Sequence, residues 1–166
     1  MSVSEQTWQA VTRFVGMEAL SLDTQDWDRW LSLYSPTCTY WLPAWRSDGT
    51  LVEDPKAEIS LIYYSSRAGL EGRVYRVRTG RAASALVLPR TVHMINPVDV
   101  QEREDGGLKV RANWTVHSSY EERVATCFGY ALYELSRNHE GALQIQSKTT
   151  VLLNDRVHEV LDFYNV

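Results

Sequence analysis

The chain has 166 residues, of which 17 are Lys or Arg and 21 are Asp or Glu, giving a formal net charge of −4. That length suits one domain covering residues 1–166, and the mixed charge, without a basic cluster interleaved with aromatics, argues against nucleic-acid binding. No apolar run approaches the roughly 20 residues that span a bilayer, and the N-terminus lacks a signal pattern, so we expect a cytoplasmic protein with buried, reduced Cys38 and Cys127.

Two amphipathic helices are predicted at the start of the chain. The first covers residues 2–22, where Ser2 and Glu5 have capping-box spacing and apolar side chains recur on one face. Asp23 has the features of a second N-cap, and the helix after it carries a single apolar stripe that stops before Pro36. We therefore expect a helix pair with a short connection.

A strand, a loop and a second strand–helix unit follow. Residues 37–45 are β-branched and aromatic and predict a strand, and the short apolar run of residues 59–64 predicts another. Ser65 or Ser66 is placed to cap a helix that runs to Thr79. Two glycines weaken this helix, so it depends on packing against the rest of the domain.

In the second half of the chain the hydrophobic period changes to two. The predicted strands cover residues 91–100, 108–117, 124–135 and 143–153. Pro97 interrupts the first of these and predicts a bulge or a sheet edge. Long antiparallel strands after a helical first half indicate an α+β domain, with helices packed on one face of a curved sheet. The last residues, 154–166, are too apolar for a solvated tail, and either fold onto the sheet or dock into a neighbouring subunit.

The sequence contains no motif for common active-site chemistry. The histidines lack metal-ligand spacing, and neither cysteine has a partner nearby. There is no glycine-rich phosphate loop and no nucleophile elbow. Asp26 and Asp28 lie at the start of the second helix, where capping and solubility explain them. We assign no catalytic, cofactor-binding or metal-binding residue from these patterns.

One polar group of residues could still form a site. His93, Asp99, Asn113, Thr115 and His117 come from neighbouring predicted strands and could share a face. In a cone-shaped α+β fold such a face lines a cavity, where an Asp or a His can act as a general base. The alternative is that this face meets solvent or a partner.

Several segments together resemble the small (beta) subunit of aromatic-ring-hydroxylating dioxygenases. They are DWDRWLSLYSP, TYWLPAW, EDPKAEISLIYY, RAGLEGRVYRVRTGR, PRTVHMI and LLNDRVHEVLDFYNV, in this order over essentially the whole chain. Within that family the sequence is most similar to the benzoate, toluate and anthranilate group, whose substrates are aromatic carboxylates. Ala82–Leu88 departs from the family pattern because it is unusually apolar, as an added contact or a loop variant.

The resemblance implies a fold and a role. The fold is a cone-shaped, curved antiparallel sheet packed on N-terminal helices, of the nuclear-transport-factor and cystatin-like type. The role is that of a non-catalytic component of an NADH-dependent dioxygenase, in an α3β3 hexamer with a large (alpha) subunit. The Rieske 2Fe-2S cluster and the mononuclear Fe(II) are then expected in the large subunit, with no cofactor in this chain.

Two hypotheses follow for the residues that carry function. In the structural-subunit hypothesis, arginine forks and aromatic side chains suit subunit contacts. The expected interface residues are Trp41, Trp45, Arg67, Arg73, Arg76, Arg78, Phe163 and Tyr164. The alternative is a free-standing isomerase or dehydratase of the same fold, with Asp99, His93 or His117 as the base.

Overall fold

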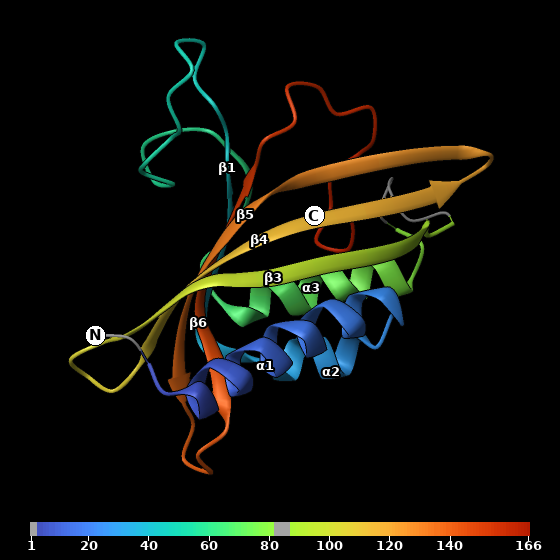
Figure 1. Ribbon diagram of the computed structural model, residues 1–166. Helices are drawn as coiled ribbons and strands as arrows, with labels where there is room; N and C mark the ends of the chain where they lie inside the picture. Colours follow the sequence, from blue (N-terminus) through green and yellow to red (C-terminus); the bar gives the residue numbers. More distant parts are fainter. Residues whose placement is uncertain (1–2, 82–86) are drawn as a thin grey trace.

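The computed structural model describes residues 3–81 and 87–166, and in this part of the chain three helices lie against one face of a curved six-stranded sheet (Figure 1). The helices are α1 (Glu5–Asp23), α2 (Trp27–Ser32) and α3 (Arg67–Arg78). The strands are β1 (Tyr34–Pro43), β2 (Ser60–Tyr64), β3 (Arg90–Glu102), β4 (Leu108–Tyr120), β5 (Arg123–Arg137) and β6 (Leu143–Leu152). This confirms the predicted α+β class.

The strand order is β2-β1-β6-β5-β4-β3, so the first two strands of the chain extend the sheet built by the last four. Neighbouring strands are antiparallel except β1 and β6, which run parallel. The sheet is therefore mixed, and the prediction of a wholly antiparallel sheet is wrong at this pair. A parallel pair needs a long crossover, and here it joins the two halves of the chain.

The helix caps differ from the predicted ones. The Ser4 hydroxyl caps α1 by accepting a hydrogen bond from the Thr7 amide at 3.1 Å. The predicted cap, Ser2, lies outside the described residues. Asp26 caps α2, so the prediction of Asp23 as that cap is wrong. Asp23 is instead the last residue of α1, and its carboxylate accepts hydrogen bonds from β3.

In the first half of the chain, the strand boundaries differ from the predicted ones by a few residues. Tyr34 begins β1 and does not end the second helix, because α2 has only six residues. Pro43 ends β1, so Trp45 lies beyond the strand, in an isolated bridge with Leu51. The second strand and third helix occupy the predicted positions. The predicted feature at Ala82–Leu88 falls largely on residues 82–86, outside the described residues.

The sheet has an inner face, toward the helices, and an outer face. On β4 the inner face consists of Leu108, Val110, Ala112, Trp114 and Val116, all buried, as the alternation predicts. The outer face of the same strand consists of Lys109, Arg111, Asn113, Thr115 and His117. The strand register shifts between Pro97 and Asp99 in β3, as predicted, and beside Gln146 in β6. Two further shifts lie in β1, between Tyr34 and Thr39 and between Leu42 and Pro43.

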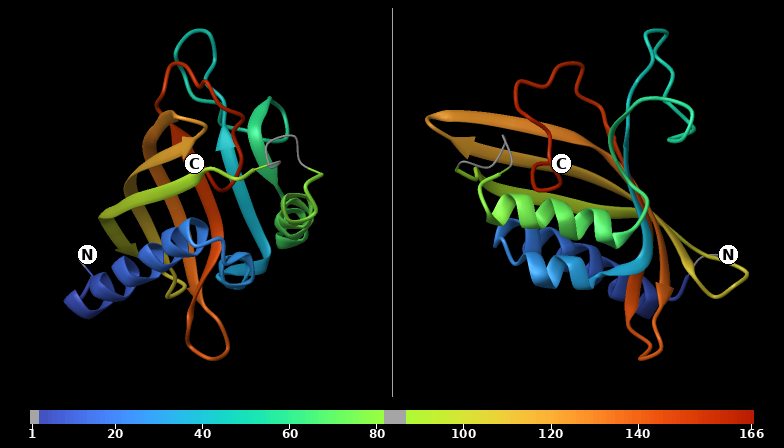
Figure 2. Two further views of the ribbon diagram at one scale, coloured as in Figure 1. Left: turned by 90° about the vertical axis from the view of Figure 1, so that its right-hand side faces the viewer. Right: turned by 180° about the vertical axis from the view of Figure 1, so that it is seen from behind.

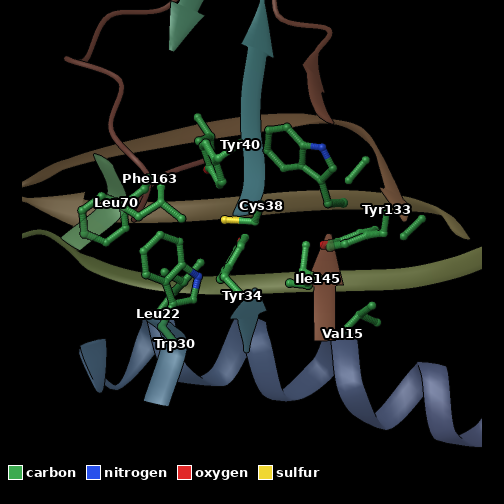
Figure 3. Close-up of a cluster of buried hydrophobic side chains, with 14 of the residues drawn as sticks. Val15, Leu22, Trp30, Tyr34, Cys38, Tyr40, Leu70, Tyr133, Ile145 and Phe163 are labelled. Atoms are coloured by element: carbon green, nitrogen blue, oxygen red, sulfur yellow. The ribbon is translucent and has the colours of Figure 1, made fainter. Parts of the chain in front are cut away.

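The C-terminal segment folds back into the concave side of the sheet, next to the helices (Figure 2). The Phe163 ring stacks on Trp30 with centroids 4.7 Å apart and meets Trp27 edge-on at 5.3 Å. Figure 3 shows Phe163 among the buried side chains of α2, α3 and β1. Of the two options for this segment, the structure thus has it packed inside its own chain. Within the described residues, no helix is both long and apolar enough to cross a bilayer.

Candidate functional site

An ionised cluster lies in the interior of the cone. The Lys148 ammonium, on β6, donates to Glu18 Oε1 of α1 at 2.7 Å. Tyr34 donates to the same oxygen at 2.5 Å, and Tyr133 donates to Glu18 Oε2 at 2.9 Å. Lys148 also lies 5.8 Å from the centre of the Tyr40 ring. All of these side chains are buried, so the cluster joins α1 to three strands through one carboxylate.

The charges in this cluster are satisfied and unsuited to proton transfer. Burial alone would raise the pKa of Glu18, but the adjacent Lys148 charge and the hydrogen bonds from Lys148, Tyr34 and Tyr133 lower it overall. Burial, followed by the Glu18 charge, raises the pKa values of Tyr34 and Tyr133. A carboxylate that already accepts several strong hydrogen bonds is a poor base. The cluster therefore holds elements together.

A second polar pair lies at the end of α1. Asp23 accepts hydrogen bonds from the Thr91 hydroxyl and from the His93 backbone amide, each at 2.9 Å. The His93 ring Nδ1 lies 2.5 Å from Asp23 Oδ1. Burial works to raise the pKa of Asp23, but these hydrogen bonds and the electrostatic interaction with the His93 ring lower it overall. This pair fixes the C-terminal end of α1 to β3.

The predicted polar group does not form one site. His93 pairs with Val116 in the register of β3 and β4, which places it on the inner face. Asn113, Thr115 and His117 lie on the outer face. Asp99 is six residues after His93, so regular alternation would place both on the inner face. The bulge after Pro97 reverses the alternation, and Asp99 therefore pairs with Arg111 on the outer face. The expectation of a shared face is therefore wrong, and only His93 points into the cone.

The interior of the cone offers little room for a substrate. His93, Trp114, Tyr133 and Lys148 line a cavity with about 20 Å³ of space for the centre of a water-sized sphere. A cavity known to hold benzene has roughly 150 Å³. An aromatic ring does not fit. This disagrees with the isomerase or dehydratase hypothesis.

Neither cysteine is a candidate nucleophile. Cys38 and Cys127 are free and buried. Burial raises the pKa of each thiol to about 11, so both stay protonated at neutral pH. In residues 3–81 and 87–166, no group of three or more His, Cys, Asp or Glu side chains is arranged to hold a metal ion.

The outer face of the sheet differs in character, because large apolar side chains remain exposed there. Phe128 is opposite Thr115 and Met94 is the next neighbour on β3, with exposed fractions of 46% for Phe128 and 51% for Met94. The exposed apolar side chains on this face are Val92, Met94, Val98, Val124, Phe128 and Leu132. We call these six residues the outer apolar patch. Contiguous apolar surface rimmed by polar side chains is typical of protein–protein contact sites.

One predicted interface residue lies beside this patch. In the sheet register Trp41 on β1 is opposite Thr149, which is opposite Leu132 of the patch. The Trp41 indole is partly exposed and donates to the Ser60 hydroxyl at 2.8 Å. Trp45 is 43% exposed, and its indole donates to the Leu152 carbonyl at 2.6 Å. Both tryptophans are accessible at the surface of the chain.

The four predicted arginines of α3 fall into two groups. Arg73 forms an ion pair with buried Asp162 of the C-terminal segment, and Arg67 donates to the Tyr34 carbonyl at 3.1 Å. These two guanidinium groups hold the chain's own elements together. Arg76 and Arg78 are exposed, and Arg78 also pairs with exposed Asp28 on α2 at 2.9 Å.

Phe163 and Tyr164, also predicted for the interface, are buried in this chain. Their exposed fractions are 0% and 3%, and the two rings meet edge-on with centroids 5.5 Å apart. They form the part of the C-terminal segment that fills the cone next to α2. In this arrangement a partner subunit would reach neither ring.

Comparison with known proteins relates this geometry to a family. The profile described as "Ring hydroxylating beta subunit" matches residues 17–159. The chain belongs to this family. Among curated relatives of this beta subunit, the 2-halobenzoate 1,2-dioxygenase small subunit of Burkholderia cepacia is 39% identical over 166 residues, covering 100% of both chains. The anthranilate 1,2-dioxygenase small subunit of Acinetobacter baylyi is 41% identical over 157 residues, 95% of this chain and 96% of that one.

A solved structure gives the same result for the fold of this beta subunit. The crystal structure of the beta subunit of the benzoate 1,2-dioxygenase from Burkholderia mallei is 32% identical, with a TM-score of 0.77, covering 100% of this chain and 99% of that chain. The predicted family and the cone-like fold are thereby confirmed. The alternative of a free-standing isomerase or dehydratase is not supported by these relatives.

Sequence reasoning missed the Glu18–Lys148 pair of the beta subunit. Glu18 lies on the same helical stripe as Val11, Val15 and Leu22, where an acidic residue needs an internal partner. A buried partner of opposite charge for Glu18 could therefore have been predicted from the sequence. The burial of Lys148 could not be predicted, because the irregularity beside Gln146 turns Lys148 from the outer to the inner face.

Proposed function

We propose that this chain is the structural small subunit of the terminal oxygenase of a benzoate-like 1,2-dioxygenase. In this role it supports large subunits that cis-dihydroxylate an aromatic carboxylate with O2 during the breakdown of aromatic compounds. Membership of the beta-subunit family, with about 40% identity along the whole chain to small subunits of such enzymes, carries the proposal. The chain works as one domain within that complex, in the cytoplasm, where NADH supplies the electrons.

Catalysis in this proposal belongs to the large subunit. The Rieske 2Fe-2S cluster and the mononuclear Fe(II) reside there, together with the substrate pocket. The contribution of the small subunit is rigidity, since its interior ion pairs fix α1 to the sheet and the C-terminal segment to α3. A rigid support keeps the sites of neighbouring large subunits at a constant separation.

We assign the outer apolar patch to contact between copies of the small subunit, in an α3β3 assembly. The patch combines aliphatic, Met and aromatic side chains, types that are enriched at subunit interfaces. Asp99 and Arg111 lie on the same face as a cross-strand pair, so the surface carries both signs of charge and two copies need not repel each other. Exposed apolar surface of this kind is covered when a closed ring of three copies forms.

The large subunit is then expected at other exposed elements. Arg76 and Arg78 belong to α3, which lies on the helix side of the sheet, opposite the outer face (Figure 1). Trp45 follows β1 in the sequence. Exposed guanidinium groups suit carboxylates of a partner because they bind them in a bidentate geometry. Trp41, at the margin of the outer apolar patch, belongs to the contact between copies.

Co-expression with the large subunit of the same enzyme tests the proposal. The purified complex is expected to contain equal numbers of the two chains, a Rieske absorption spectrum, iron, and turnover of an aromatic carboxylate. The small subunit purified alone is expected to show neither iron nor turnover. Stoichiometric iron, or a dioxygenase or isomerase activity in the isolated small subunit, would contradict the proposal.

A further inference from the structure

The small cavity in the cone contains two buried ring nitrogens that have no hydrogen-bond partner among the described residues. They are His93 Nε2 and Trp114 Nε1. Both rings line the cavity, and both are more than nine-tenths buried, with exposed fractions of 8% for the His93 side chain and 7% for Trp114. A buried polar group without a partner destabilises the fold by about 1–3 kcal/mol, so native structures rarely contain one.

The sheet register brings the two rings close together. His93 is opposite Val116 and Ile95 is opposite Trp114, so His93 and Trp114 are diagonal neighbours on the inner face of β3 and β4. Diagonal neighbours have Cβ atoms within about 7–8 Å, which long and aromatic side chains can bridge. One small molecule between the rings can therefore reach both nitrogens.

The chemistry of the two nitrogens defines that molecule. An indole N–H can only donate. His93 Nδ1 is directed at Asp23, so in the neutral ring the proton on Nδ1 leaves Nε2 as an acceptor. The missing partner must accept one hydrogen bond and donate another. The space of about 20 Å³ has room for water and is far smaller than the roughly 150 Å³ of a cavity known to hold benzene.

We propose that this cavity is a binding site for one ordered water, which accepts a hydrogen bond from Trp114 Nε1 and donates one to His93 Nε2. Thr150 lines the same cavity, and its hydroxyl is a further polar group there. The water completes a chain that runs from Asp23 at the end of α1, through His93 on β3, to Trp114 on β4. It thereby locks α1 onto the sheet, independently of how the subunit assembles.

The site explains why a histidine–aspartate pair inside a cone need not be catalytic. The cavity walls combine apolar side chains, from Leu22, Ile95, Ala131 and Val166, with the already paired polar groups of Glu18, Tyr133 and Lys148. Val166 belongs to the C-terminal segment that fills the cone. His93 acts as a positioning residue in this arrangement, because its two nitrogens connect a helix end to a strand.

A crystal structure of the small subunit at a resolution that shows ordered waters, combined with 15N NMR of the His93 ring, tests the site. The expected result is one density peak within about 2.7–3.2 Å of both nitrogens, and an Nε2 resonance typical of a hydrogen-bonded acceptor. Trp114→Phe removes the N–H, and should both weaken the water density and shift the Nε2 resonance. Trp30→Phe is the matched control, since Trp30 Nε1 is also buried without a partner but does not line this cavity.

Three results would overturn the proposal. One is a dry cavity in the wild-type crystal that takes up xenon under pressure. Another is a molecule larger than water in the density. The third is an Nε2 resonance that responds equally to Trp30→Phe and Trp114→Phe. The wild-type crystal structure decides between the first two and the proposal even if a variant does not fold.

Discussion

On the inner face of the sheet, charged side chains are buried and paired, whereas on the outer face apolar side chains are exposed to water. Glu18 and Lys148 are 1% and 5% exposed, while Phe128 is 46% exposed. Both arrangements reverse the usual distribution of residue types. The inner one is explained within the chain by its hydrogen bonds. The outer one is what the proposed contact between copies of the small subunit would cover.

The largest effect is expected from breaking the inner ion pair. Lys148→Met leaves the Glu18 carboxylate buried without its counter-charge, and removing one partner of a buried pair costs about 3–5 kcal/mol. Urea denaturation of the isolated small subunit measures this loss. The double variant Glu18→Gln, Lys148→Met is the control, because it removes both charges and should recover much of the stability. Equal destabilisation in the two variants would show that the pairing of the charges is unimportant.

The second-largest loss of stability is expected from Gly129→Ala. A Cβ built on Gly129 would lie 1.9 Å from the Val151 carbonyl oxygen, so alanine forces β5 and β6 apart. Overpacking of this kind costs about 2–3 kcal/mol.

Gly72→Ala in α3 is the matched control for Gly129→Ala. Nothing lies within 4 Å of the Cβ built there, and the residue is inside a helix, so the same replacement should stabilise the protein by about 1 kcal/mol. Thermal unfolding of both variants measures the contrast. Equal effects of the two replacements would contradict the close approach of β5 and β6.

The pH dependence of stability tests whether Glu18 on the inner face is ionised and paired in the folded protein. Because the pKa of Glu18 is lowered in the folded state, its contribution is present above the ordinary glutamate pKa of about 4.3 and is lost as pH falls through the folded pKa. The stability difference between wild type and Glu18→Gln should therefore be constant near neutral pH and narrow below about pH 4. Urea titrations at several pH values measure it. A difference that widens in acid would contradict the lowered pKa.

The smallest effect on stability is expected on the outer face. Phe128→Glu replaces a side chain that is already half exposed, so the folded monomer should lose no more than about 1 kcal/mol, mostly through lower β propensity. Urea denaturation of the isolated subunit checks this value. A loss as large as that of Lys148→Met would mean that Phe128 is part of the core.

The sequence predicted the two faces of β4 well, because strict alternation over a long strand leaves one solution. It failed for the polar group because the sequence does not give the register of β3 and β4, which places His93 opposite inner-face Val116, and because one extra residue after Pro97 turns Asp99 to the outer face. The same limit hid Lys148, which follows the irregularity in β6. A bulge can be suspected from a proline, but its position decides the face of every residue after it.

Interface residues were harder to predict than faces. Arg73 and Phe163 have the residue types that subunit contacts favour, yet in the structure they bind Asp162 and stack on Trp30 within the chain. The same types serve cores and interfaces alike, because both bury large side chains and pair charges. By contrast, Met94 and Phe128 were read simply as strand residues. Their exposure, which the sequence pattern does not give, is the observation behind the proposed contact.

The central claim is that the outer apolar patch assembles small subunits while the inner face stabilises each one. Its most direct test is the mass, by light scattering, of the complex formed with the large subunit when the small subunit carries Phe128→Glu or, as control, Leu20→Glu. Leu20 is 51% exposed but lies on α1, away from the patch. The account predicts a wild-type hexamer with Leu20→Glu and smaller, dissociated species with Phe128→Glu. A folded Phe128→Glu subunit that still forms the full hexamer would contradict it.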